Sequence, residues 1–293
     1  MNIDWNTDIY CLIGNPVSKS LSPRIHNYIF EFNNKNCIYL AFKVEDRDFK
    51  AIINSFKALN IKGFNVTIPY KIKIMDHLDE IEKEARLLGA VNTVKNVNGK
   101  LIGYNTDGLG FARSLTEEGI KIEDRNFLIL GAGGASHAIS TKLAIEGAKK
   151  IVILNRTIKK AEVLGKNIKD KFENTQVTWD SLDNVVKYLD SDIVVNCTSA
   201  GMYPNEDISP IDSTILNEDT VIYDIIYKPI ETKFLKDAKR NKLKTIGGIS
   251  MLINQAILSQ QIWLNDVENY SKNFKKIEGF LDSNVEDIVN KLL

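Results

Sequence analysis

The chain has 293 residues, of which 44% are hydrophobic and 26% charged, as in an ordinary globular protein. Basic and acidic residues number 38 each, so no charge excess favours nucleic acid or an anionic membrane as a partner. No apolar run approaches the ~18 residues of a membrane span, and the first residues lack the regions of a signal peptide. At this length we expect two domains, each with its own core.

The cysteines and histidines predict neither a disulfide framework nor a metal site. The three cysteines are odd in number, widely spaced and set in strand-like runs, which predicts reduced core residues in a cytoplasmic protein. They are Cys11, Cys37 and Cys197. The three histidines show no spacing suited to metal ligation.

Strand and helix patterns alternate over residues 1–105 and end in a hairpin marked by Asn98-Gly99. We expect Ser22, followed by Pro23, and Asp46 to be helix N-caps. The predicted strands are 8–13, 37–44, 63–67, 90–97 and 100–104, and the predicted helices are 23–32, 46–59, 69–77 and 79–88.

The rest of the chain up to residue 248 has the pattern of a doubly wound α/β sheet with ligand loops at the carboxyl ends of its strands. The predicted strands are 127–130, 150–154, 176–178, 192–197, 221–226 and 244–246. The predicted helices are one after the turn 105–108 that ends near 118, then 138–146, 158–168 and 231–241.

Two further helices are expected near the end of the sequence, at 250–263 and at 283–292, where Ser283 and Glu286 have the spacing of a capping box. We expect them to pack back on the first domain, because the second already has a complete wound sheet. The predicted domains are therefore residues 1–106 with 249–293, and residues 107–248. Residues 265–279 carry no assignment.

A glycine-rich turn follows the apolar run 127–130. Gly131 permits a sharp turn, Gly133 lets the backbone approach a pyrophosphate, and Ser136 is small enough for the helix to pack on the strand, although the fingerprint prefers Gly or Ala there. The N-terminus of the following helix offers N–H groups and a partial positive charge to phosphates. This stretch predicts the front half of a dinucleotide-binding unit.

The next strand ends in Asn155-Arg156-Thr157, with Lys159 and Lys160 close behind. No carboxylate is present there to bind a ribose 2′-hydroxyl, whereas a guanidinium pairs well with a 2′-phosphate. The alternative is a solvated basic helix start. We favour the phosphate, which predicts NADP rather than NAD.

Lys71 and Asp107 are two polar residues whose role the local sequence leaves open. Lys71 lies in the first turn of the helix expected over 69–77, where the helix dipole disfavours a cation and would favour proton exchange with a substrate oxygen. It could equally be a surface lysine. Asp107 is an excellent N-cap, and from local sequence alone capping is its expected role.

Together these features resemble the shikimate dehydrogenase family, NADP-dependent oxidoreductases of aromatic amino-acid (chorismate) biosynthesis. The resemblance covers nearly the whole chain through ordered motifs whose combined spacing is highly specific. The motifs are Gly14-Asn15-Pro16 with Ser20-Leu21-Ser22-Pro23, then 65–71, 89–93, 103–108, 131–135, 155–157, 196–202 and 251–256.

The resemblance implies an α/β substrate domain joined to a Rossmann-type NADP domain, with Lys71 and Asp107 as the catalytic pair. Substrate would be bound by Lys71 and Asp107 together with Ser20 and Ser22 for the carboxylate, Asn92 and Gln255 for ring hydroxyls, and Thr67 and Tyr227. Cofactor would be bound by Gly131, Ala132, Gly133, Gly134, Ala135, Asn155, Arg156, Thr157 and Lys160, with Ile225 and Gly248 at the nicotinamide end.

The implied reaction is the reversible reduction of 3-dehydroshikimate to shikimate by hydride transfer, without a metal. A quinate/shikimate dehydrogenase using NAD or NADP is the nearest alternative, and a non-catalytic NADPH sensor is the alternative of another class. The implied partners are small molecules, with no nucleic acid and no membrane, and a homodimer stays open.

Three positions depart from the family pattern. Lys19 stands where His is usual and could add positive charge near the substrate carboxylate. His137 replaces a common Arg after the glycine loop and removes one phosphate contact. Ser250 replaces a common Gly before Met251. None of the three touches the proposed acid/base pair.

Overall fold

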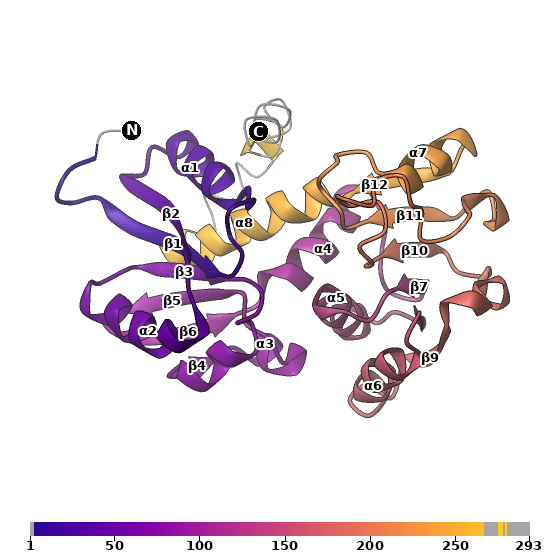
Figure 1. Cartoon of the computed structure of the whole chain (residues 1–293), viewed down its shortest axis with the longest axis horizontal. Coiled ribbons are helices and arrows are strands. Elements are labelled where there is room, and N and C mark those ends of the chain that lie inside the picture. Colours follow the sequence, from indigo (N-terminus) through magenta and orange to yellow (C-terminus); the bar gives the residue numbers. More distant parts are fainter. Residues whose placement is uncertain (1–2, 267–274, 278, 280–293) are drawn as a thin grey trace. The chain divides into compact units, whose positions relative to one another are not determined.

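The computed structural model describes residues 3–266, 275–277 and 279, so the helix expected at 283–292 lies outside the described residues. The chain divides into two compact units, Met1–Thr106 with Ile253–Leu293, and Asp107–Leu252 (Figure 1). Each unit contains one six-stranded sheet. No helix in the described part of the chain has the length and apolar character needed to cross a membrane.

The sheet of the first unit is mixed, in the strand order β2-β1-β3-β5-β6-β4. Strand β1 pairs in parallel with β2 and β3, and β5 pairs antiparallel with β3 and β6. The strands are β1 (Asp8–Gly14), β2 (Cys37–Lys43), β3 (Gly63–Val66), β4 (Glu80–Ile81), β5 (Thr93–Val97) and β6 (Lys100–Tyr104). The helices are α1 (Ser22–Phe32), η1 (Asp46–Asp48), α2 (Phe49–Ala58), η2 (Lys73–His77) and α3 (Lys83–Leu88), where η marks a 3-10 helix.

Most of helix α8 (Gly248–Leu264) belongs to this first unit, which resumes at Ile253. Its Trp263 is buried, stacks on Tyr10 with ring centres 4.9 Å apart, and donates from Nε1 to the Val94 carbonyl at 2.9 Å. Gly63 of β3 makes this possible, because a Cβ there would overlap the indole ring. Aromatic burial of this size is a large stabilising contribution to the first core.

The sheet of the second unit is parallel throughout, in the order β12-β11-β10-β7-β8-β9. This is the doubly wound arrangement, in which the strand order reverses between β7 and β10. The strands are β7 (Asn126–Leu130), β8 (Lys150–Asn155), β9 (Gln176–Ser181), β10 (Ile193–Asn196), β11 (Val221–Asp224) and β12 (Lys244–Gly247). The helices are α4 (Thr106–Glu117), α5 (Gly134–Ile145), α6 (Ile158–Lys169), η3 (Leu182–Tyr188), η4 (Ser213–Ile215) and α7 (Lys233–Arg240).

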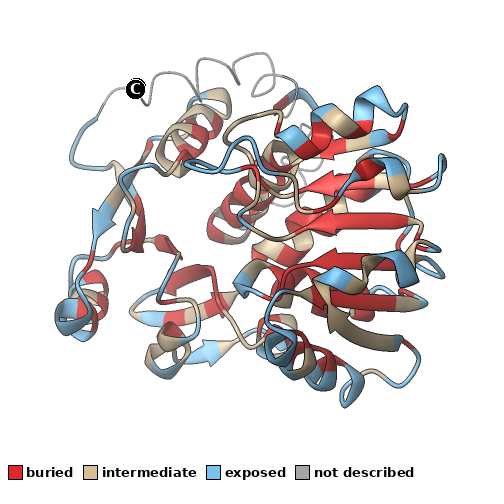
Figure 2. Ribbon diagram, turned by 45° about the vertical axis from the view of Figure 1, so that its right-hand side comes forward, coloured by how far each residue is buried: buried red, intermediate tan, exposed pale blue. Residues whose placement is uncertain are grey.

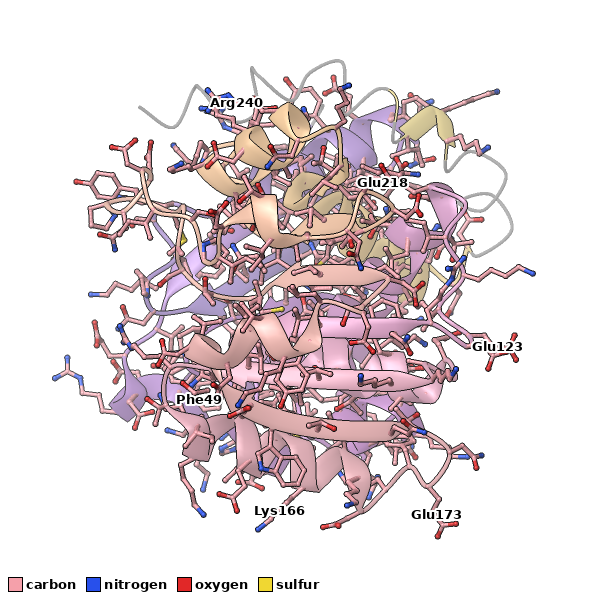
Figure 3. All side chains as sticks on the ribbon, turned by 90° about the vertical axis from the view of Figure 1, so that its right-hand side faces the viewer. Phe49, Glu123, Lys166, Glu173, Glu218 and Arg240 are labelled. Atoms are coloured by element: carbon pink, nitrogen blue, oxygen red, sulfur yellow. The ribbon has the colours of Figure 1, made fainter. Side chains whose placement is uncertain are left out.

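The central strands of this sheet are buried on both faces, so they read as continuous apolar runs rather than alternating ones. Figure 2 shows β7 and β10 coloured as buried, and their inner residues, such as Ile129 and Val195, have no exposed surface. Charged side chains point outward, as Lys166 of α6 and Arg240 of α7 do in Figure 3.

Two predicted helices of the first unit are wrong in part. The segment 69–77 contains turns and only the short helix η2, and Glu80–Ile81 forms strand β4 where a helix was expected from residue 79. Tertiary pairing overrides the local pattern here, because β4 pairs with β6 and the Asp79 carboxylate accepts from the Leu101 N–H at 2.7 Å. Glu82 then caps α3, accepting from the N–H groups of Glu84 and Ala85.

Three expected helix caps are also wrong. Ser22 is the first residue of α1, and the hydroxyl of Ser20 accepts its N–H at 3.2 Å. Asp46 lies inside η1 rather than before α2. Asp107 lies in the first turn of α4, which begins one residue earlier at Thr106. Its negative charge there interacts favourably with the positive end of the helix dipole.

His26 of α1 is a fully buried histidine of the first core. Its ring stacks on Tyr39 with centres 4.1 Å apart, and its Nδ1 lies 3.1 Å from Nε2 of Gln260 in α8. Burial lowers the pKa of His26 to about 3. Because this lies below the unfolded value of about 6.5, the unfolded chain binds one more proton between these pH values, and stability falls as the pH falls through that window.

The His26→Gln variant is therefore expected to lose less stability on acidification than the native chain. Below pH 6.5 the native His26 reduces the free energy of unfolding by up to about 1.4 kcal/mol per pH unit, and glutamine does not. Urea unfolding at several pH values from 7.5 to 5.0 measures both slopes. Equal slopes for the two proteins would contradict the buried neutral histidine.

Candidate functional site

The turn between β7 and α5 depends on Gly131. Its φ of +108° is strained for any residue with a side chain, and a Cβ there would lie 2.8 Å from the carbonyl oxygen of Cys197. The Gly131 N–H donates to the Leu154 carbonyl of β8 at 2.7 Å. The chain then enters α5 at Gly134, four residues earlier than the sequence predicts.

Ser136 fits the place where the dinucleotide fingerprint prefers Gly or Ala. It is fully buried in the first turn of α5, and its hydroxyl donates to the Gly131 carbonyl at 2.7 Å. The hydrogen bond satisfies the extra polar group and braces the turn. Ser136 therefore departs from the fingerprint without leaving a buried hydroxyl unpaired.

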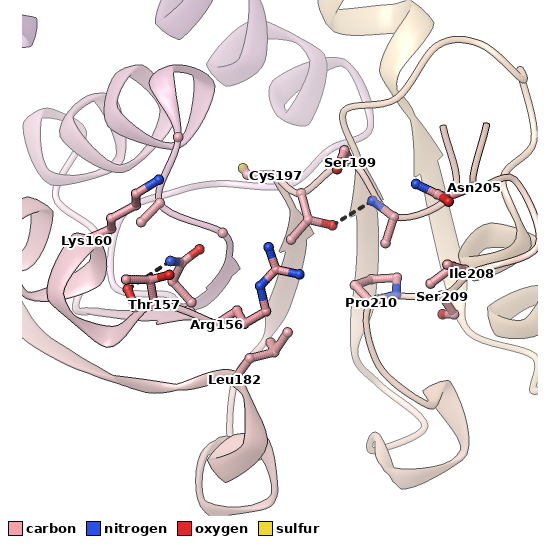
Figure 4. Close-up of a pocket in the computed structure, with 16 residues that line it drawn as sticks. Arg156, Thr157, Lys160, Leu182, Cys197, Ser199, Asn205, Ile208, Ser209 and Pro210 are labelled. Carbon is pink, nitrogen blue, oxygen red and sulfur yellow. Dashed lines mark hydrogen bonds between the residues drawn. The ribbon is translucent and has the colours of Figure 1, made fainter. Parts of the chain in front are cut away.

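A pocket of about 460 Å³ opens over this turn. In Figure 4 the side chain of Arg156 extends from the end of β8 into the space between Lys160 and Pro210. The pocket brings together most of the predicted cofactor residues: Gly131, Ala132, Gly133, Asn155, Arg156, Thr157 and Lys160.

The chemistry of this pocket fits the phosphates of a dinucleotide. Gly133 is the N-cap of α5 without a side-chain cap, so the helix offers its first N–H groups to a ligand. A Cβ on Gly133 or Gly134 would meet no atom within 4 Å, which leaves room for a close approach. Arg156 and Lys160 are exposed, and none of the described residues lining the pocket carries a carboxylate.

The opposite wall is the loop after β10, held by two buried side chains. Asn196 accepts from the N–H and hydroxyl of Thr198 and donates to Asp224 at 3.1 Å. Asp224 also accepts from the Ile226 N–H at 3.0 Å and from the Thr232 hydroxyl at 2.7 Å. Burial raises the pKa of the Asp224 carboxyl. One carboxylate thus fixes the pocket loop, the segment after β11 and the start of α7.

Sequence reasoning missed most of this wall. The signal was available in part, since a loop of small residues follows a strand at the carboxyl edge of the sheet. The missed lining residues are Leu182, Cys197, Thr198, Ser199, Ala200, Asn205, Ile208, Ser209 and Pro210.

Four predicted cofactor residues do not line the pocket. Gly134 and Ala135 lie in the first turn of α5. Ile225 follows β11, and a Cβ on Gly248 would overlap the Ile225 carbonyl, so these two pack directly on each other. The nearby Tyr227 is half-buried, and burial raises the pKa of its hydroxyl.

In the first unit, predicted substrate residues gather at the carboxyl ends of β1 and β3. The hydroxyls of Ser20 and Ser22 lie 3.1 Å apart. Thr67 follows β3, donates its N–H to the Ile13 carbonyl at 2.9 Å, and packs against Gly14, where a Cβ would overlap its methyl group.

Asn92 is the most constrained of these residues. It is 3% exposed, its Oδ1 accepts the Thr106 N–H at 2.7 Å, and its Nδ2 donates to the Thr106 hydroxyl at 3.0 Å. Gln255 of α8 is also buried, and its carbonyl accepts from the Ser259 hydroxyl at 2.9 Å. The Asn92 amide therefore belongs to a hydrogen-bonded core, to which Ser259 joins the backbone of Gln255.

Lys71 and Asp107 are both half-buried. The Lys71 carbonyl accepts the Val91 N–H at 2.8 Å, which joins its backbone to the segment of Asn92, and Asp107 follows Thr106 in the chain. Because η2 begins only at Lys73, the helix-terminus argument for Lys71 is wrong. Its position rests on backbone pairing instead.

The parallel sheet and the phosphate-fitting pocket at its carboxyl edge define the second unit as a Rossmann-type dinucleotide-binding domain. Residues 12–94 match the family described as the shikimate dehydrogenase substrate binding domain. Residues 112–229 match the family described as shikimate / quinate 5-dehydrogenase.

Full-length relatives agree with these matches. A shikimate dehydrogenase (NADP(+)) from Caldanaerobacter subterraneus subsp. tengcongensis is 44% identical over 95% of this chain and 99% of that protein. Another from Methanocaldococcus jannaschii is 47% identical over 89% of this chain and 93% of that protein. A crystal structure of shikimate 5-dehydrogenase from Listeria monocytogenes in complex with shikimate and NAD is 34% identical, with a TM-score of 0.86 over 91% of this chain and 94% of that one. This chain belongs to the shikimate dehydrogenase family.

Gly131→Ala is expected to lower the free energy of unfolding by about 2–4 kcal/mol, because it combines a strained φ with overlap on Cys197. Gly133→Ala is the matched control, since its Cβ points into open space, and its expected change is within about 0.5 kcal/mol. Urea unfolding measures both. Equal losses in the two variants would contradict the claim that the turn requires glycine specifically at position 131.

Proposed function

We propose that the chain catalyses the reversible, NADP-dependent reduction of 3-dehydroshikimate to shikimate, a reaction of aromatic amino-acid biosynthesis. The observation that carries the proposal is the cationic pocket at the ends of β7 and β8, in a chain whose relatives are named NADP(+)-dependent shikimate dehydrogenases.

The cofactor would be held by the α5 N-terminus at its pyrophosphate and by Arg156, Thr157 and Lys160 at its 2′-phosphate. A planar guanidinium can pair with two phosphate oxygens at once, and no carboxylate lines the described pocket to oppose it. Bound NADPH supplies the hydride that reduces the substrate ketone.

Lys71 and Asp107 would manage the proton of the reaction. Reduction of the ketone places negative charge on its oxygen, which the Lys71 ammonium stabilises and then protonates. Asp107 orients the ammonium and accepts a hydrogen bond from a ring hydroxyl. In the reverse direction Lys71 takes the proton from the C–OH group of shikimate.

The remaining polar groups of the first unit would fix the ring relative to Lys71. The paired hydroxyls of Ser20 and Ser22 bind the substrate carboxylate, with Lys19 adding positive charge to the loop. Asn92 and Gln255 bind ring hydroxyls, and Thr67 and Tyr227 contact the substrate. Such remote contacts accelerate the reaction by holding the reacting atoms in position.

The direct test is absorbance at 340 nm with shikimate or quinate as substrate and NADP⁺ or NAD⁺ as cofactor. We expect the highest kcat/KM for shikimate with NADP⁺. A preference for quinate would favour the quinate/shikimate dehydrogenase suggested by the second family description, and the complex of the Listeria protein makes NAD⁺ the necessary comparison. Cofactor binding without turnover on either substrate would favour a non-catalytic NADPH sensor.

Lys71→Ala is expected to lower kcat by ~10²-fold or more while KM stays near its native value, because the proton donor is lost. Lys73→Ala, two residues away, is the matched control. Lys73 lies on η2, its Nζ is 2.5 Å from Oδ1 of Asp46 on η1, and its loss is expected to leave turnover unchanged. Unchanged turnover in the Lys71 variant would rule out its role as the acid.

Arg156→Ala is expected to raise KM for NADPH by about 10- to 100-fold and KM for NADH much less, because only NADPH carries the 2′-phosphate. Arg240→Ala removes an exposed arginine that pairs with Asp237 on α7, and it is expected to leave both constants unchanged. Equal losses for the two cofactors in the Arg156 variant would show that Arg156 does not bind this phosphate.

The cytoplasmic location, the absence of nucleic-acid and membrane partners and a homodimer stay predictions from the sequence. Cys11, Cys37 and Cys197 are free cysteines.

A further inference from the structure

We propose that Ser259 of α8 is a positioning residue for the substrate site, setting the orientation of the Asn92 side chain through one buried hydroxyl. The proposal rests on the proposed function, since it assigns a consequence for shikimate binding. Ser259 is fully buried, and it stands outside every motif that the sequence singles out.

The Ser259 hydroxyl joins four separate segments of the first unit. Its Oγ lies 2.9 Å from the Thr93 hydroxyl of β5 and 3.1 Å from the Thr106 hydroxyl at the start of α4. It accepts from Nδ2 of Asn65 in β3 at 3.2 Å and donates to the Gln255 carbonyl, one turn earlier in α8, at 2.9 Å. The four partners come from β3, β5, α4 and α8 itself.

The direction of these hydrogen bonds is fixed from the far side by Asn65. The Tyr39 hydroxyl donates to Oδ1 of Asn65 at 2.7 Å, and Nδ2 of Asn65 donates to the Asn92 carbonyl at 3.1 Å. Because a backbone carbonyl can only accept, the amide nitrogen must face Thr93 and Ser259, whose oxygens therefore accept from it.

The chain of bonds ends on the side chain of Asn92. The Thr93 hydroxyl has a single hydrogen, for which Oδ1 of Asn92 at 3.1 Å and Oγ of Ser259 at 2.9 Å are alternative acceptors. Thr106 bonds both polar atoms of the Asn92 amide. Without the Ser259 oxygen, the hydroxyls of Thr93 and Thr106 lose a shared partner inside a dry core. Since buried polar groups pair wherever they can, both are expected to turn further onto Asn92 and disturb its orientation toward substrate.

The test is steady-state kinetics of Ser259→Ala with shikimate and NADP⁺. KM for shikimate is expected to rise about 5- to 20-fold while KM for NADP⁺ stays within twofold. Ser140→Ala is the matched control. Ser140 is also a fully buried helical serine, its Oγ has no hydrogen-bond partner in the described structure, and its loss is expected to leave KM for shikimate unchanged.

Two further variants separate positioning from simple packing. Ser259→Cys keeps the shape of the side chain, so the packing of the core is preserved, but its thiol is a weaker hydrogen-bonding group than the hydroxyl. Its KM for shikimate is expected to lie between those of the native chain and Ser259→Ala. Thr93→Val removes the partner hydroxyl at constant shape, and the double variant with Ser259→Ala is expected to raise KM less than the product of the single effects, because both act through one network.

A native chain that oxidises no shikimate would overturn the proposed function, and this proposal with it. An active native chain whose Ser259→Ala variant keeps the native KM for shikimate, or raises both KM values equally, would overturn only the role of Ser259. If the increase in KM for the double variant equalled the product of the two single increases, the role of Ser259 would likewise be overturned.

Discussion

The side chain of Asn92 is held by Thr106 and Thr93, and these in turn by Ser259 and Asn65, in a core from which water is largely excluded. A buried amide without partners would cost about 1–3 kcal/mol, so the surrounding segments must meet in one arrangement. That requirement joins β3, β5, the start of α4 and α8 around the proposed substrate residues. The chain leaves the first unit directly after Thr106, at Asp107.

The pocket of the second unit differs from this core, because its main polar groups face solvent rather than one another. Gly133 leaves the N-terminus of α5 without a side-chain cap, and Arg156 and Lys160 remain exposed beside it. The helix N-terminus and the two cationic side chains are left for a ligand, whereas the walls are held by the protein: Gly131 packs on Cys197, and Asp224 with Asn196 fixes the loop opposite. The Asn65 and Asn92 amides of the first unit are thus hydrogen-bonded within its core, whereas the second unit has a helix N-terminus and cationic side chains open to a ligand.

What the sequence predicts well is what depends on local chemistry. The apolar run before Gly131, the glycine turn and the basic residues after β8 all act through neighbours in the chain, and the structure has the strand, the turn and the pocket. The family and the α/β fold are confirmed for the same reason, since ordered motifs carry them. The roles of individual site residues stay predictions.

What the sequence did not predict depends on distant partners. Strand β4 forms because β6 is there to pair with it, although the local pattern favours a helix. Ser259 gains its role from residues 153 to 194 positions away, which no local pattern contains. The pocket wall at 197–200 is an irregular loop positioned by the buried Asn196, which Asp224 holds from the next strand. In each case tertiary packing, rather than propensity, decides the outcome.

The central claim is that two differently built halves serve one hydride transfer, and isotope transfer tests it most directly. NADPH carrying deuterium at the transferable C4 position is incubated with the protein and 3-dehydroshikimate, and the product is analysed by mass spectrometry. The account predicts one deuterium on the carbinol carbon of shikimate, and none there when unlabelled NADPH is used in D₂O. Label arriving from the solvent instead of the cofactor would contradict it.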